Sequence, residues 1–183
     1  TKPTIQAPNL EWIQCDLLDV YAVEDAMQGI TQVYHCAAIV SFDAKKKDQL
    51  IHDNVAITEN IINIALEQNI QKLIHVSSIA SLGRADLDKP ISEDTYWTES
   101  KENSSYSKSK HYAEMHVWRG IAEGLNAAIL NPGIILGEGN WKVGSAQLMT
   151  NVASGFPYYT EGVNAWVDVK DVARAMLLLM DSD

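Results

Sequence analysis

The fold of this chain is indicated by one stretch, KLIHVSS at residues 72–78, in which a short apolar run ends in two serines. A strand that is buried on both faces reads in this way where it reaches the carboxyl edge of an open parallel sheet. Similar runs occupy residues 12–15, 32–36 and 127–130, and each of them also ends in small or polar residues. The sequence therefore predicts four parallel strands.

Segments with helical spacing lie between and after these strands. The predicted helices cover residues 20–28, 48–68, 106–123, 145–153 and 170–180. In the second of them, apolar residues recur at the spacing of one helical face: Val55, Ile57, Ile61, Ile62, Ala65 and Leu66. Short strands that alternate with helices predict an α/β fold with a doubly wound parallel sheet of the Rossmann type.

The first two strands of such a sheet are missing from the predicted set. A dinucleotide-binding sheet opens with a strand and a glycine-rich turn, because glycine lets the backbone approach the pyrophosphate closely. Residues 1–28 contain no glycine, and Gly137 and Gly139 come too late in the chain to form that turn. The usual spatial order, 3-2-1-4-5-6, would then have a gap beside the fourth strand. We expect an internal piece of a longer chain; the alternative is a smaller, self-sufficient sheet.

Three segments follow from this pattern. Residues 1–140 are predicted to form a partial dinucleotide-binding domain, residues 141–165 part of a small substrate lobe, and residues 166–183 a return to the first domain. Residues 84–105 make an unusually long connection, which includes Pro90 and several acids but has no helical period. Connections of this length are often functional.

Composition and charge exclude several classes of function. Of the 183 residues, 46% are hydrophobic and 21% are charged, which is typical of a globular domain. The formal net charge of -10 argues against binding to nucleic acid. The five histidines include no i, i+4 pair, and the two cysteines fit no zinc or disulfide pattern, so no metal site is predicted. With no signal peptide or long apolar run, we expect a cytoplasmic protein that does not bind membranes.

The candidate chemistry lies in Tyr106 and Lys110, which are four residues apart and share one face of a predicted helix. A phenol has a pKa of about 10 in water, so it needs a nearby cation to act as a general acid or base at neutral pH. Lys110 can supply that cation. A Tyr and a Lys four residues apart also occur by chance, so the residues around this pair are needed to judge whether it is catalytic.

Those neighbours read YSKSKHYAE over residues 106–114, and they resemble the Tyr-x-x-Ser-Lys-x-x-Ala-Glu helix of the extended short-chain dehydrogenase/reductase family. Residues 75–83, HVSSIASLG, are similar to the segment in which that family has its catalytic Ser or Thr, five residues before a glycine. That position is Ser78 here. The resemblance implies a triad in which Ser78 hydrogen-bonds the substrate oxygen, Tyr106 exchanges its proton and Lys110 assists Tyr106.

The resemblance covers nearly the whole chain and implies a binding site for NAD or NADP. The residues that it assigns to the cofactor are Asp16, Leu17, Ala37, Ala38, Asn54, Ser77, Tyr106, Lys110, Asn131, Pro132 and Gly133. Some of them have simpler interpretations: Asp16 as a turn residue, Asn54 at a helix start as an N-cap, and Ser77 as a partner of local backbone groups. The choice between NAD and NADP stays open, because the deciding residue belongs to the absent second strand.

The resemblance favours an NAD(P)-dependent oxidoreductase that transfers a hydride between the cofactor and an alcohol or ketone. Residues 37–42, AAIVSF, are similar to the dihydroflavonol reductase and 3β-hydroxysteroid dehydrogenase branch. A nucleotide-sugar epimerase with the same triad is the alternative, and a non-catalytic dinucleotide-sensing module is the second. A sugar 4,6-dehydratase is less favoured, because Ile79 and Ala80 stand where those enzymes have acidic residues. The expected partners are a small-molecule substrate and a second copy of the chain, packed through the helices at 48–68 and 106–123.

Overall fold

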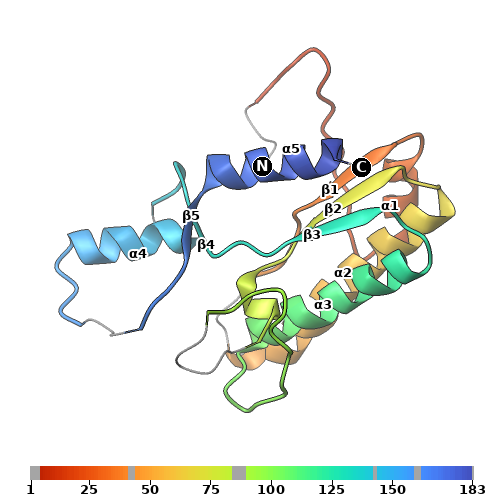
Figure 1. The fold of residues 1–183 in the computed structure, drawn as a ribbon. Helices are drawn as coiled ribbons and strands as arrows, with labels where there is room; N and C mark the ends of the chain where they lie inside the picture. The colour runs from red at the N-terminus through yellow and green to blue at the C-terminus, as the bar shows by residue number, and fades with distance from the viewer. Residues whose placement is uncertain (1–4, 41–43, 84–89, 142–143, 159–161, 183) are drawn as a thin grey trace.

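The structure is a computed structural model that describes residues 5–40, 44–83, 90–141, 144–158 and 162–182. Its helices are α1 (Val20–Met27), α2 (Lys47–Glu67), α3 (Ser105–Ala122), α4 (Gly144–Ala153) and α5 (Val169–Asp181). Its strands are β1 (Gln32–His35), β2 (Lys72–Val76), β3 (Ala127–Leu130), β4 (Ile134–Leu136) and β5 (Trp166–Asp168). Figure 1 shows α2 and α3 over one face of the β1–β3 sheet and α5 across the other face, so the predicted α/β fold is confirmed.

The main sheet is parallel and has the strand order β1-β2-β3. Its register pairs Tyr34 with Ile74 and Ile74 with Ala128, so the three strands run level with one another. The turns that follow them therefore meet at one edge of the sheet, where ligands bind in folds of this class. Among the described strands, β1 pairs with β2 alone and has an open second edge.

The core lies between this sheet and the helices that cover it. Ile62 of α2 is completely buried, and a Cβ placed on Gly120 of α3 would lie only 2.6 Å from its Cγ2 atom. This glycine is therefore needed for the two helices to approach so closely. The buried cluster consists of Val23, Met27, Ile57, Ile61, Ile62, Ile64, Ala65, Ile70, Leu73, Val117 and Leu125.

The helices agree with the predicted ranges to within one residue at each end. The predicted strand at residues 12–15 is wrong, because no strand of the described residues pairs with this segment. Without such a partner, Trp12 and Ile13 are 47% and 59% exposed, and the Trp12 indole N–H donates to the carbonyl of Ile5. The predicted position of Asn54 at a helix start is also wrong, since α2 begins at Lys47 and includes the buried Leu50.

A second, two-stranded parallel sheet pairs β4 with β5. Together with α4 it lies to one side of the main sheet (Figure 1). The predicted long connection is confirmed for residues 90–104, which contain no helix or strand, and its residues 84–89 lie outside the described residues. Two of these loop residues, Ile91 and Ser104, lie at the carboxyl edge of the main sheet.

Candidate active site

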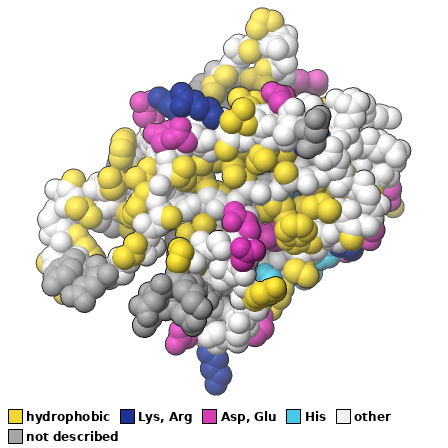
Figure 2. All heavy atoms as spheres, in the orientation of Figure 1, with side chains coloured by type: hydrophobic (Ala, Val, Ile, Leu, Met, Phe, Trp, Pro, Cys, Tyr) yellow, Lys and Arg dark blue, Asp and Glu magenta, His cyan; other side chains and the backbone are white. Residues whose placement is uncertain are grey.

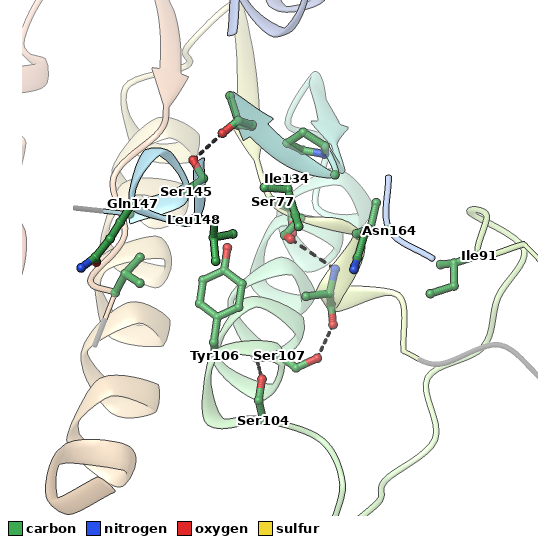
Figure 3. Close-up of a pocket in the computed structure, with 18 of the residues that line it drawn as sticks. Ser77, Ile91, Ser104, Tyr106, Ser107, Ile134, Ser145, Gln147, Leu148 and Asn164 are labelled. Atoms are coloured by element: carbon green, nitrogen blue, oxygen red, sulfur yellow. Dashed lines mark hydrogen bonds between the residues drawn. The ribbon is translucent and has the colours of Figure 1, made fainter. Parts of the chain in front are cut away.

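A cavity of about 760 Å³ opens where the ends of β2 and β3 face α3 and α4. This volume is in the range of small-molecule sites. Its polar wall is built from the turn after β2 and the first turn of α3, and its apolar wall includes Ile134 and Leu148. Ile91, from the long connection, completes the lining on the side shown in Figure 3.

Tyr106 lines this cavity from the first turn of α3. The turn begins there because Ser104 is the N-cap residue, and its hydroxyl oxygen accepts a hydrogen bond from the backbone N–H of Ser107 at 3.0 Å. Figure 3 shows the phenol projecting into the cavity toward Leu148 and Ser145. The phenolic oxygen is thus placed where a bound molecule would lie.

Ser78 lines the same cavity from the turn after β2. It is the N-cap of a short 3-10 helix, η2 (Ile79–Ser81), and its Oγ accepts a hydrogen bond from the backbone N–H of Ala80 at 3.2 Å. A hydroxyl that accepts one bond still has its own proton to donate. The structure therefore brings Ser78 and Tyr106 to one cavity, with a hydroxyl proton on each.

Lys110 lies one helical turn after Tyr106, and only 6% of its surface is exposed. Its ammonium group donates a hydrogen bond to the carbonyl oxygen of Val76 at 3.1 Å. Burial lowers the pKa of Lys110, and nearby Cys36 and Glu114 act in the opposite direction. An ammonium group can donate three hydrogen bonds. The described residues give Lys110 a single hydrogen-bond acceptor, so it can donate to a further ligand.

Residues predicted to bind the cofactor near β1 lie apart from the large cavity. Leu17 and Ala37 line a second, smaller cavity of about 300 Å³ beside β1. Ala38 is half-buried in the turn that follows this strand. The carboxylate of Asp16 is exposed and accepts a hydrogen bond from the backbone N–H of Leu18 at 3.0 Å, which is the arrangement of a turn residue.

Asn54 fixes the turn after β1 instead of capping a helix. Its side-chain oxygen accepts from the N–H of Ile39 at 2.7 Å, and its side-chain nitrogen donates to the carbonyl of Ile39 at 2.9 Å. The same nitrogen lies 3.3 Å from the hydroxyl of Ser109 on α3. This buried amide therefore connects the turn after β1 with the helix that carries Tyr106.

The predicted residues near β2 and β3 have mixed surroundings. Ser77, Pro132 and Gly133 line the large cavity, but the hydroxyl of Ser77 donates to Glu114, as does the side-chain amide of Asn131. Glu114 was part of the quoted motif, yet sequence reasoning gave it no role. The α4 residues that line the cavity lie in the segment predicted as a substrate lobe, residues 141–165, but none of them was predicted individually as a site residue.

The model of the NAD dependent epimerase/dehydratase family matches residues 1–183. The chain belongs to this family. Cinnamoyl-CoA reductase 1 of Petunia hybrida is 27% identical over 179 residues, which are 92% of this chain and 53% of that protein. Sterol demethylase protein B of Methylococcus capsulatus is 26% identical over 170 residues, which are 91% of this chain and 51% of that protein.

A solved structure has the same fold as this family member. It is the UDP-glucose 4-epimerase of Thermus thermophilus in complex with NAD, with a TM-score of 0.73 and 26% identity, covering 92% of this chain and 59% of the other. The relatives are enzymes, and the family is NAD-dependent. The chain spans about half the length of the curated relatives that it matches.

The described part of this family member shows neither a metal-binding cluster nor a membrane-spanning helix. It contains no group of three or more His, Cys, Asp or Glu side chains that could hold a metal ion. No helix in the same residues combines the length and apolar character that crossing a bilayer requires. On the face drawn in Figure 2, Lys and Arg side chains stand as isolated groups among acidic and apolar ones.

Two buried histidines of this family member lie side by side behind the site. The rings of His35 on β1 and His75 on β2 are 4.8 Å apart, and His35 Nε2 lies 3.0 Å from the hydroxyl of Thr58. Burial lowers the pKa of His35 to about 4, and the neighbouring Lys110 acts in the same direction. Burial also lowers the pKa of His75 well below its ordinary value. Both rings are therefore neutral at pH 7.

Acidification is expected to destabilise the folded chain through these histidines. The pKa of His35 is 6.5 in the unfolded chain and about 4 in the folded chain. Its contribution to stability is therefore complete above pH 6.5 and is lost as the pH falls toward 4. For His35 alone, the loss in the free energy of unfolding is about 3 kcal/mol. Urea denaturation at a series of pH values measures how the free energy of unfolding depends on pH. This dependence should be shallower for His35→Gln than for the unchanged protein, and an equal dependence would contradict the lowered pKa of His35.

Proposed function

We propose that the chain carries the catalytic groups of an NAD(P)-dependent oxidoreductase that interconverts an alcohol and a ketone. The catalytic residues in this proposal are Ser78, Tyr106 and Lys110. The observation that supports it is the common cavity of Ser78 and Tyr106 at the carboxyl edge of the sheet, with the buried ammonium of Lys110 one turn behind the phenol. This arrangement combines a proton donor, a hydrogen-bond donor and a cation.

The chain's residues would act on the substrate oxygen. When bound, the nicotinamide supplies the hydride for reduction or accepts it during oxidation. The phenol of Tyr106 gives its proton to the carbonyl oxygen during reduction, and takes the alcohol proton in the reverse direction. The hydroxyl of Ser78 donates a hydrogen bond to the same oxygen and stabilises its developing charge. The positive charge of Lys110 favours the phenolate form of Tyr106.

The cofactor in this proposal is NAD or NADP, bound along the carboxyl edge of the main sheet. The remaining donors of Lys110 fit the hydroxyl groups of a nicotinamide ribose, because the ammonium is buried and has one described acceptor. The full set proposed to contact the cofactor is Asp16, Leu17, Ala37, Ala38, Asn54, Ser77, Tyr106, Lys110, Asn131, Pro132 and Gly133.

The cavity lining favours an oxidoreductase over a nucleotide-sugar epimerase. The described residues that line it include no Asp, Glu, Lys or Arg. A sugar nucleotide has two negative phosphates, which proteins usually bind with Arg or Lys. Apolar side chains such as Val40, Ile79 and Leu148 instead suit an uncharged alcohol or ketone. A non-catalytic sensing module is disfavoured, because such a module needs neither Tyr106 nor Lys110.

A substrate comparison tests this function. The full-length protein is expected to oxidise NADH or NADPH in the presence of uncharged cyclic or aromatic ketones, followed by the absorbance of the reduced nicotinamide. UDP-glucose, with NAD present, is the matched substrate for the epimerase alternative. Epimerisation of UDP-glucose without reduction of any ketone would overturn the proposal in favour of that alternative.

We also propose that the protein is a homodimer in the cytoplasm, with α2 and α3 at the interface. On α3, Tyr112, Met115 and Trp118 are spaced for one helical face, and their exposed fractions are 36%, 52% and 53%. Exposed apolar side chains grouped in this way are typical of interfaces.

A further inference from the structure

We propose that Glu114 is a positioning residue for Ser78. Its buried carboxylate connects α3 with the turn after β2 and the turn after β3, and in this way holds the Ser78 hydroxyl at the cavity. This inference rests on the proposed function, in which Ser78 binds the substrate oxygen.

The carboxylate of Glu114 gathers donors from several segments of the chain. Glu114 lies on α3 one turn after Lys110, and only 7% of its surface is exposed. Its Oε2 atom accepts hydrogen bonds from Ser77 Oγ at 2.6 Å, Ser81 Oγ at 2.6 Å and Asn131 Nδ2 at 2.9 Å. Its Oε1 atom accepts one from the indole N–H of Trp118 at 3.3 Å.

Two of these donor atoms also lie against the backbone of Ser78. The amide of Asn131 has two protons and can donate to both groups, whereas the Ser81 hydroxyl has one proton and donates to either Glu114 or Ser78. The carbonyl oxygen of Ser78 lies 2.7 Å from Ser81 Oγ and 3.2 Å from Asn131 Nδ2. The N–H of the next residue, Ile79, donates to the carbonyl of Pro132 at 3.1 Å. Glu114 thus reaches Ser78 through both turns, and the direction of the Ser78 side chain depends on how these turns are held.

The hydrogen-bond donors of this cluster require a carboxylate at residue 114. Three donors meet at one oxygen atom, and an ionised carboxylate accepts from all of them without offering a proton of its own. A buried charge is costly unless it is hydrogen-bonded, and the four donors meet that need. Glu114→Gln preserves the shape of the side chain. The atom that faces the three donors, however, becomes either an uncharged amide oxygen or an NH₂ group.

Steady-state kinetics of the full-length protein separates positioning from general stability. Glu114→Gln is expected to lower kcat by about 10-fold or more with KM changed by less than about 3-fold, because the interaction acts in the transition state. If Glu114 acts through Ser78, the same change made in a Ser78→Ala background should lower kcat by less than about 2-fold. Fully additive losses in this double-mutant cycle would overturn the proposal.

A second readout does not depend on turnover. Hydrogen exchange of the backbone amides of residues 76–82 and 130–134 should be faster in Glu114→Gln than in the unchanged protein. Glu123→Gln is the matched control at the C-cap of the same helix, since Glu123 is paired with Arg119 at the surface, 3.1 Å apart. Its exchange at these segments and its kcat should equal those of the unchanged protein. Unchanged exchange in Glu114→Gln would also overturn the proposal.

The outcomes distinguish this inference from the proposed function. If the unchanged protein reduces no ketone, the function fails, while the exchange measurement still decides whether Glu114 holds the two turns. If Glu114→Gln does not fold, Ser81→Ala takes its place in the test, because it removes a single donor to Oε2. Its loss of kcat should be smaller and should likewise vanish in the Ser78→Ala background.

Discussion

Tyr106→Phe is expected to lower kcat by about 10³-fold while the affinity for NADH changes by less than about 2-fold. Removing the hydroxyl takes away the group that exchanges the substrate proton, and general acid–base catalysis contributes about 10²- to 10⁴-fold. The ring still fills its place in the cavity wall, so the surroundings of a bound dinucleotide stay the same. Ketone reduction measures kcat, and NADH fluorescence titration measures the affinity.

The matched control for this prediction is Tyr112→Phe. Tyr112 lies on the same helix, but its hydroxyl donates to the carboxylate of Glu99 at the surface, away from the cavity. This variant should retain kcat within about 2-fold, since it loses one hydrogen bond to Glu99 and keeps the ring that the proposed α3 interface would bury. A Tyr106→Phe variant that keeps more than a tenth of kcat would show that another group exchanges the proton.

Gly133→Ala is expected to lower both stability and activity. A Cβ at Gly133 would lie 2.5 Å from the carbonyl oxygen of Ala165, and that oxygen accepts the hydrogen bond from the N–H of Ile134 at 2.8 Å. The backbone would have to shift where β4 meets β5, next to the cavity. Overpacking of this kind costs about 1–3 kcal/mol in the free energy of unfolding. Urea denaturation of the full-length protein measures that cost.

Gly139→Ala serves as the control for this prediction, because a Cβ there would have no neighbour within 4 Å. Its free energy of unfolding should stay within about 0.5 kcal/mol of the unchanged protein, as for most surface substitutions. Equal stability of the two alanine variants would mean that the contact between Gly133 and Ala165 relaxes easily. Kinetic assays of both variants then show whether kcat depends on the contact between Gly133 and Ala165 beside the cavity.

The main sheet and its helices could be predicted because their apolar residues are spaced regularly. The run at residues 72–76 is buried along almost its whole length, and apolar periodicity marks α2 from Leu50 to Ala65, over about four turns. Residues 12–15 look similar in sequence, but strand formation also needs a partner strand, which sequence alone does not provide. β4 and β5 have three residues each, too few for a recognisable period.

The catalytic candidates were accessible to sequence reasoning because they stand in two short motifs. Helical spacing places Tyr106 and Lys110 on one face, and a glycine five residues later marks Ser78. The proposed role of Glu114 depends on three donors to its Oε2 atom that are 17 to 37 residues away in the chain, so the spacing of the sequence does not reveal it. Leu148 lies in the predicted helix and substrate lobe, but only the structure shows which side chains of that helix reach the cavity.

The open edge of β1 has a consequence for handling the protein. An unpaired strand presents free N–H and C=O groups to any other extended chain, and proteins usually protect such edges with charges or proline. Residues 32–40, QVYHCAAIV, contain no Asp, Glu, Lys, Arg or Pro, and the Tyr34 side chain on this strand is 39% exposed. Wherever no further strand covers this edge, it is a starting point for aggregation, and engineered fragments of the protein need a solubilising charge there.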